Sequence, residues 1–119
     1  MIDVANFRGI QLSGGFAIVE IECTPEPMQD PLGREAVAQT RIVGSEFHLL
    51  IRSGLCDEEM SVTLYHEVLE AATVASAHAP DSVLDLNEAG FERVARQMHR
   101  ELGPASPENL NRMLQSYGF

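Results

Sequence analysis

The spacing of hydrophobic residues changes about half-way along the chain, from a strand pattern to a helix pattern. The segment Gly14–Cys23 ("GGFAIVEIEC") is rich in β-branched residues after a glycine pair, which predicts a strand. Further strands are predicted over 37–43 and Glu46–Arg52, where apolar and polar residues alternate in the second segment. Between them, Thr24–Gly33 contains three prolines and is predicted to be a loop.

The second half of the chain has the spacing of amphipathic helices. The first predicted helix, about Asp57–Ala77, contains no glycine or proline and begins with three acidic residues, which favour the helix N-terminus. A second helix is predicted over about Leu86–Leu102, and a third begins at Ser106-Pro107 and stops at Gly118. Because the strands precede the helices, we predict an α+β fold: a small, largely antiparallel sheet, then two long helices and a C-terminal helix.

Length, composition and charge narrow the class of protein. The chain has 119 residues, of which 45% are hydrophobic and 22% charged, so we expect one folded domain spanning 1–119. Its 18 acidic residues outnumber 8 basic ones and give a formal net charge of −10. Such a charge opposes binding to phosphate backbones and to anionic lipid, so we expect neither a nucleic-acid nor a membrane partner.

The expected location follows from two further features of the sequence. The N-terminus lacks the layout of a signal peptide, and no apolar run has the length of a membrane span. The two cysteines, Cys23 and Cys56, form neither a disulfide framework nor a CxxC zinc knuckle. We therefore expect a cytoplasmic protein with reduced thiols.

Candidate chemistry begins with the segment "LYHEVLE" on the first predicted helix. His66 and Glu70 are four residues apart, so their side chains point the same way from adjacent turns and can hold one cation. Glu67 follows the first of these ligands, at the position of a general base. A lone pattern of this kind also occurs on ordinary solvated helix faces.

The second predicted helix adds carboxylates on its core-facing side. Its apolar stripe runs back by one turn onto Glu88, and Glu92 lies along the edge of the same stripe. Acidic groups that two helices present inward can share a cation, which removes their mutual repulsion. Alternatively, Glu88 is simply an exposed residue that the dipole favours near the helix start.

Together the two segments carry a resemblance to a known family. "HEVLE" followed by "NEAGFE" (Asn87–Glu92) resembles the thermolysin-type gluzincins, in which His-Glu-x-x-His is followed on a second helix by Asn-Glu-Ala-x-x-Asp. The preceding "HLLIRSGLCDEE" is similar to the entry strand and turn of minimal gluzincins. The resemblance covers about half of the chain, from Glu46 to Arg100, and implies a single zincin-like domain with zinc or another divalent metal.

The resemblance also implies a role for each matched residue. His66 matches the first metal ligand, Glu67 the general base, and Glu88 the third ligand. Glu92 and Asn87 match residues of the family that lie behind the ligands. Glu70 takes the second ligand position in place of a histidine, which makes the motif HExxE.

The histidine-to-glutamate difference changes the chemistry that the resemblance implies. One imidazole and two carboxylates neutralise a divalent ion, so the ion polarises a substrate less, and harder ions such as manganese or iron compete better with zinc. Glu92 has no second histidine to orient, and a proton shared between Glu70 and Glu92 would give a metal-free structural network. His99 and Tyr117 are candidates for stabilising an oxyanion by residue type alone.

Two functions follow as expectations. In the first, the chain is a metal-binding protein and a weak metallopeptidase acting on a peptide or protein substrate. In the second, it is a catalytically inactive relative that binds a protein partner through its cleft or its acidic surface.

Overall fold

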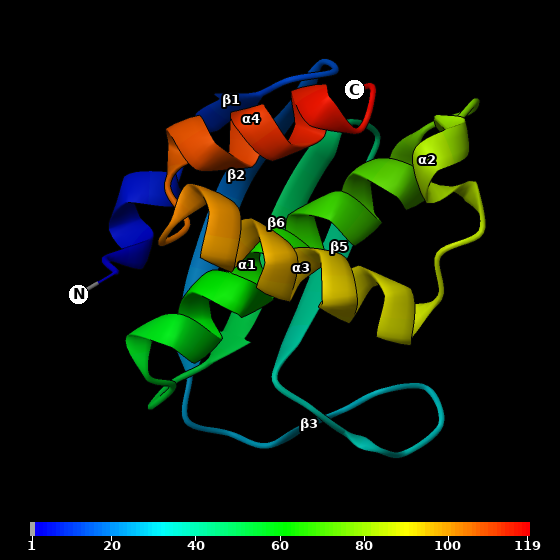
Figure 1. Ribbon diagram of the computed structural model, residues 1–119. Coiled ribbons are helices and arrows are strands. Elements are labelled where there is room, and N and C mark those ends of the chain that lie inside the picture. The colour runs from blue at the N-terminus through cyan, green and yellow to red at the C-terminus, as the bar shows by residue number, and fades with distance from the viewer. Residues whose placement is uncertain (1) are drawn as a thin grey trace.

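A mixed four-stranded sheet forms the first half of the molecule. The computed structural model describes residues 2–119. The strands lie in the order β1-β2-β6-β5 (Figure 1), with the bounds β1 Ile10–Leu12, β2 Phe16–Thr24, β5 Ala38–Val43 and β6 Glu46–Arg52. The β1–β2 and β5–β6 pairs are antiparallel, and the central β2–β6 pair is parallel. The predicted α+β class is confirmed, with a parallel pair at the centre of the sheet.

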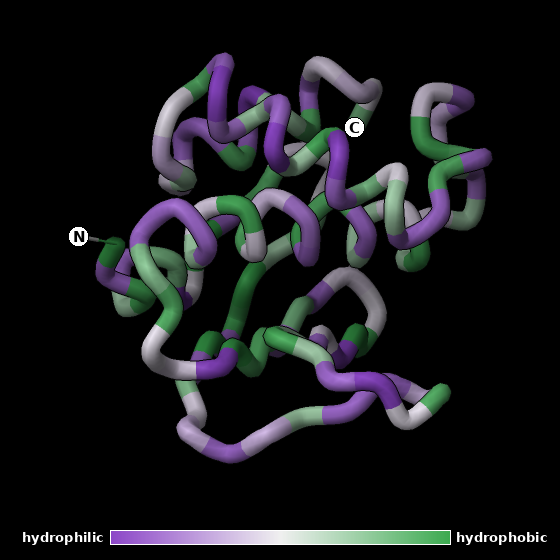
Figure 2. The backbone as a smooth tube through the Cα atoms, turned by 60° about the horizontal axis from the view of Figure 1, so that its bottom comes forward, coloured by the Kyte–Doolittle hydropathy of each residue, from purple (hydrophilic) through white to green (hydrophobic). Residues whose placement is uncertain are grey.

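The alternating pattern of β6 decides which face of the sheet is buried. Phe47, Leu49 and Ile51 are buried, whereas His48 and Arg52 between and beyond them remain partly exposed. The buried face packs against the helices, and Figure 2 shows the hydrophobic stretch running through the middle of the sheet. β5 is an edge strand, because its single partner in the sheet is β6.

The second half of the chain is helical, as predicted. The helices are α1 (Asp57–Ala75), α2 (Asp81–Leu84), α3 (Glu88–Leu102) and α4 (Pro107–Ser116), and a 3-10 turn, η1 (Val4–Phe7), precedes the sheet. α1 packs against β5 and against both α3 and α4, and α4 also contacts β1. No helix within residues 2–119 combines the length and apolar character needed to cross a bilayer.

Capping residues set the starts of the later helices. The side chain of Asn87 accepts a hydrogen bond from the backbone N–H of Gly90, so α3 begins at Glu88 and not at the predicted Leu86. Ser106 caps α4 in the same way, and Pro107 stands at its first position as expected.

α1 is enclosed on most sides, which explains its unusually apolar sequence. Leu64, Tyr65, Val68 and Leu69 have no exposed surface. A helix buried this completely leaves only a narrow strip toward solvent. That strip holds the three polar residues of the HEVLE segment, which are partly exposed.

The predicted loop over Thr24–Gly33 is partly wrong. Within it, β3 (Met28–Gln29) pairs in antiparallel fashion with β4 (Glu35–Ala36) and forms a two-stranded hairpin. We call residues 28–36 the flap. The prolines flank these short strands and leave their residues free to pair, so the local composition hid the hairpin.

Candidate metal centre

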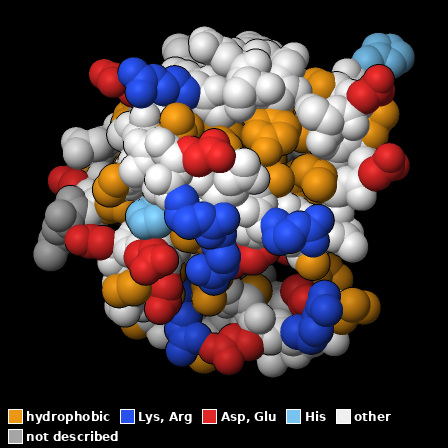
Figure 3. Space-filling view, in the orientation of Figure 1, with side chains coloured by type: hydrophobic (Ala, Val, Ile, Leu, Met, Phe, Trp, Pro, Cys, Tyr) orange, Lys and Arg blue, Asp and Glu red, His pale blue; other side chains and the backbone are white. Residues whose placement is uncertain are grey.

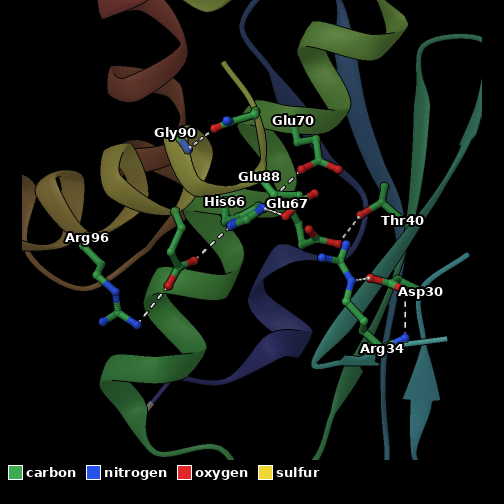
Figure 4. A network of polar contacts seen from close by, with 11 residues as sticks. Asp30, Arg34, Thr40, His66, Glu67, Glu70, Glu88, Gly90 and Arg96 are labelled. Carbon is green, nitrogen blue, oxygen red and sulfur yellow. Dashed lines mark hydrogen bonds and ion pairs between the residues drawn. The ribbon is translucent and has the colours of Figure 1, made fainter. Parts of the chain in front are cut away.

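The centre is built around the imidazole of His66 on α1, where both ring nitrogens meet carboxylates (Figure 4). Nε2 lies 3.1 Å from Oε2 of Glu70 and 3.0 Å from Oε2 of Glu88. Nδ1 lies 3.0 Å from Oε1 of Glu92. The two predicted segments therefore come together, with two carboxylates on one side of the ring and a third on the other.

Helix geometry accounts for this convergence. His66 and Glu70 lie one turn apart on α1, and Glu88 and Glu92 lie one turn apart on α3, which packs against α1. The ring of Phe91 lies 6.1 Å from the His66 imidazole and fills the space beside it. Because the Asn87 cap fixes the first turn of α3, it also fixes the backbone position of Glu88, from which the side chain extends toward the imidazole ring.

Glu67 joins the group from the neighbouring position on α1. One ligand atom each from His66, Glu67 and Glu70 can be chosen so that all lie within 4.8 Å of one another. On its other side, Oε1 of Glu67 accepts a hydrogen bond of 3.3 Å from the hydroxyl of Thr40 on β5. The carboxylate thus bridges the centre and the edge strand.

The carboxylates control the charge of the imidazole. Burial of the ring lowers the pKa of His66, but hydrogen bonds to Glu70 and Glu92 outweigh burial and raise it to about 9. The same hydrogen bond from His66 lowers the pKa of Glu70 below its ordinary value. At neutral pH, without a cation, the ring is an imidazolium surrounded by acids.

Two of the acids are shifted toward their protonated form. Burial is the main reason that the pKa of Glu67 rises to about 7. A hydrogen bond with Glu70 raises the pKa of Glu88 above its ordinary value. One alternative considered for the sequence was a proton shared between Glu70 and Glu92; in the structure Glu70 is hydrogen-bonded to Glu88, and Glu92 faces His66.

The donor set fits a divalent cation. An ion bound at about 2.0–2.2 Å holds neighbouring tetrahedral donors about 3.3 Å apart, and the carboxylate oxygens of Glu70 and Glu88 already lie 3.1 and 3.0 Å from Nε2. A cation bound at this point would displace the proton on Nε2 of the imidazole. Two carboxylates would then neutralise its charge.

Glu92 contacts the first histidine of the motif, His66, a pairing that was not predicted from the sequence. Its carboxylate faces Nδ1 of His66 and is itself paired with Arg96 at 2.9 Å. A metal-ligating histidine usually has its second nitrogen held by a carboxylate, which fixes the tautomer and the ring orientation. Glu92 therefore orients the histidine that is present and needs no second one.

The centre opens into a cleft of about 1180 Å³. The carboxylates of α1 and α3 line one wall, and the flap together with residues 38–41 of β5 lines the other. Figure 3 shows the hollow between α3 and the flap, with acidic side chains inside it and basic and hydrophobic ones along its lower rim. A chain-like ligand can thus reach the centre from solvent.

Three residues singled out in the sequence lie elsewhere. Asn87 caps α3, and Nδ1 of His99 lies 2.8 Å from the hydroxyl of the buried Ser61. Neither His99 nor Tyr117 is among the described residues that line the cleft. Thr40 was not predicted; it shares the less exposed face of β5 with Ala38 and Ile42, and this alternation is the signal that could have indicated it.

Comparison with protein-family models, with curated proteins and with solved structures finds no match for this chain. The assignment of a function therefore depends on the geometry of the centre and of the cleft.

Proposed function

We propose that this protein binds one divalent metal ion through His66, Glu70 and Glu88, and that it acts as a weak metallopeptidase. The observation that carries the proposal is the arrangement around His66: two carboxylates converge on Nε2, and Glu92 holds Nδ1. A histidine in an ordinary ion pair on a helix surface needs a partner at one ring nitrogen only. Here the ring is mostly buried, and both of its nitrogens have carboxylate partners.

A bound divalent ion supplies a Lewis acid that polarises a carbonyl group. Glu67 would accept the proton of the water molecule that attacks this carbonyl group and pass it to the leaving amine, since it lies beside the ligand atoms and its pKa of about 7 suits proton transfer near neutral pH. The hydroxyl of Thr40 holds one oxygen of this carboxylate and leaves the other for the proton.

The edge strand β5 supports a peptide as the substrate class. The backbone N–H of Arg52 donates to the carbonyl of Val37, so Val37 faces β6 and the alternate residues Ala38, Thr40 and Ile42 turn their backbone groups to the free edge. Two of those three also line the cleft. An extended peptide can add to this edge and pass the centre.

The proposed ligands favour slow peptide hydrolysis and allow several divalent metals to bind. Two carboxylates neutralise a divalent ion, so a substrate carbonyl is polarised less than at a site with two imidazoles. Carboxylate oxygens also suit manganese and ferrous iron as well as zinc.

A metal titration tests the proposal. Calorimetric titration of chelator-treated protein with Zn²⁺ and with Mn²⁺ is expected to give one site per chain, and His66→Ala to weaken it at least a hundredfold. His78→Ala is the matched control, because His78 is an exposed histidine in the turn after α1. Absence of binding in the wild type, or equal binding by His66→Ala, would refute the metal centre.

A peptidase assay separates the enzyme from a metal-binding protein. We expect metal-loaded wild type to cleave an unstructured protein such as casein slowly, and Glu67→Gln to lose this activity by roughly a hundredfold or more while it keeps its metal. Equal cleavage by Glu67→Gln would exclude Glu67 as the base.

A second candidate function is that of a catalytically inactive protein-binding module. It is favoured by the completeness of the polar network: within residues 2–119, every buried side-chain nitrogen or oxygen has a hydrogen-bond partner without a cation. In that case the wild type is as inactive as Glu67→Gln, and partner binding is unaffected by removal of metal.

A further inference from the structure

The two walls of the cleft differ in chemistry. The α1 and α3 wall presents four carboxylates around His66. The opposite wall combines charged side chains, Arg34 and Arg41 among them, with exposed apolar ones: Leu32 on the flap is 76% exposed, and Val37, directly after the flap, is 45% exposed. Few large hydrophobic side chains within residues 2–119 are exposed to this extent. Leu32 and Val37 are two of them, and both lie on the same side of the cleft.

The exposure of Leu32 follows from a well-ordered turn. Oδ1 of Asp30 accepts hydrogen bonds from the backbone N–H groups of Leu32 and Arg34, both at 2.9 Å, and its Oδ2 pairs with Nε of Arg34 at 2.7 Å. Gly33 has a φ of 80°, a conformation that L side chains rarely adopt. This network fixes the turn at the flap tip and leaves Leu32 exposed, and Figure 2 shows a short hydrophobic stretch at this tip.

The base of the flap is joined to the sheet. Met28 is buried, the side chain of Gln39 donates to the carbonyl of Gln29 at 3.0 Å, and Glu35 pairs with Arg52 of β6. The tip is therefore held at a set position relative to β5. A peptide on the free edge of β5 would meet the flap at a constant place in its sequence.

We propose that the flap is a specificity-determining wall, with Leu32 as its main contact, which selects peptides that carry an apolar side chain beside the metal-binding group. This proposal rests on the proposed metal centre. A preformed apolar surface gains from contact with an apolar side chain, because both lose surface to water.

Hydroxamate probes test this proposal separately from catalysis. Hydroxamates chelate divalent metals, so acetohydroxamate reports the centre alone, while N-acetylated hydroxamates of glycine, leucine and glutamate add side chains of different chemistry. Their affinities for metal-loaded, full-length protein are to be measured by calorimetry. We expect the leucine probe to bind about tenfold more tightly than the glycine probe, and also more tightly than the glutamate probe, whose side chain offers less apolar surface to Leu32.

Two variants assign this preference to the flap. Leu32→Ser is expected to reduce the preference for leucine over glycine to about twofold and to leave acetohydroxamate binding unchanged. Leu84→Ser is the matched control, because Leu84 is 57% exposed on α2 and does not line the cleft; it should keep the full preference.

The outcomes are distinguishable. Equal affinity of wild type for the leucine and glycine probes, or an unchanged preference in Leu32→Ser, overturns the role of the flap and leaves the metal centre intact. Failure of every probe, acetohydroxamate included, to bind the metal-loaded protein overturns the proposed centre and the flap proposal with it.

Discussion

The two walls of the cleft are held in place by different forces. On the α1 and α3 wall, carboxylates from two packed helices hold a charged and mostly buried histidine between them. On the flap wall, a short turn is fixed by its own hydrogen bonds and presents an exposed leucine. Changes in the first wall should therefore affect stability and metal binding, whereas changes in the second should affect ligand choice.

The largest expected effect is the pH dependence of stability in the metal-free protein. The pKa of His66 rises from 6.5 to about 9 on folding, so the stabilisation from its charged form is fully present below pH 6.5 and is lost as the pH rises through about 9. The free energy of unfolding should fall by up to ~3 kcal/mol from below pH 6.5 to above pH 9, and by ~2 kcal/mol of this between pH 7.5 and pH 9.5. Urea unfolding of wild type and His66→Gln at pH 7.5 and 9.5 measures it.

The window is chosen so that Glu67, whose pKa is about 7 in the folded protein, contributes little further change above pH 7.5. His66→Gln should lose most of the difference between the two pH values. An equal pH dependence in both proteins would contradict the charged state assigned to His66.

Next in size is the loss of a charged ligand. Glu70→Gln keeps the shape of the side chain but removes the carboxylate that faces Nε2 of His66, so the affinity for Zn²⁺ should fall roughly a hundredfold. Glu59→Gln, an exposed change on the same helix, should bind as wild type does. Competition with a fluorescent chelator measures both. Matching affinities would remove Glu70 from the ligand set.

A smaller effect on metal affinity is expected for Glu92, which contacts a ligand and is not itself a ligand. Glu92→Gln removes the charge that holds Nδ1 of His66, and metal affinity should fall about tenfold. Glu101→Gln, an exposed change on the same helix, is the control. A loss as large as that of Glu70→Gln would make Glu92 a direct ligand and not an orienting residue.

The smallest effect on stability is expected at the flap. Leu32→Ala exchanges an exposed side chain and should change the free energy of unfolding by less than ~0.5 kcal/mol. Leu69→Ala, which empties a fully buried position on α1, should cost ~2–5 kcal/mol. Thermal unfolding of both variants tests the contrast. A large loss in Leu32→Ala would mean that the flap contributes to the core.

Local patterns were sufficient to predict most of the fold. The bounds of β6 and the starts of α1 and α4 match the structure, because alternation, acidic first turns and Ser-Pro caps are encoded within a few residues. The parallel pairing of β2 with β6 was not predicted, since it joins segments far apart in the sequence and leaves no local periodicity. α1 ends at Ala75, two residues before the predicted Ala77.

For the candidate site as well, spacing within one helix was predictable from the sequence, and contacts between helices were not. The spacing of His66 and Glu70 on one helix, and of Glu88 and Glu92 on the next, is local and was found. Which carboxylate meets which ring nitrogen depends on how α3 crosses α1, and the sequence alone did not assign Glu92 to His66. Thr40 and the flap reach the centre through the sheet, so only the tertiary structure joins them to it.

Crystals of the protein soaked in Mn²⁺ or Zn²⁺, with diffraction recorded at the absorption edge of the metal, test the central claim most directly. We predict one anomalous peak within about 2.0–2.3 Å of Nε2 of His66 and of a carboxylate oxygen each from Glu70 and Glu88, with Glu92 still on Nδ1. A peak elsewhere on the molecule, or a fully soaked crystal in which the His66 cluster keeps its carboxylate pairs and holds no metal, would contradict the account.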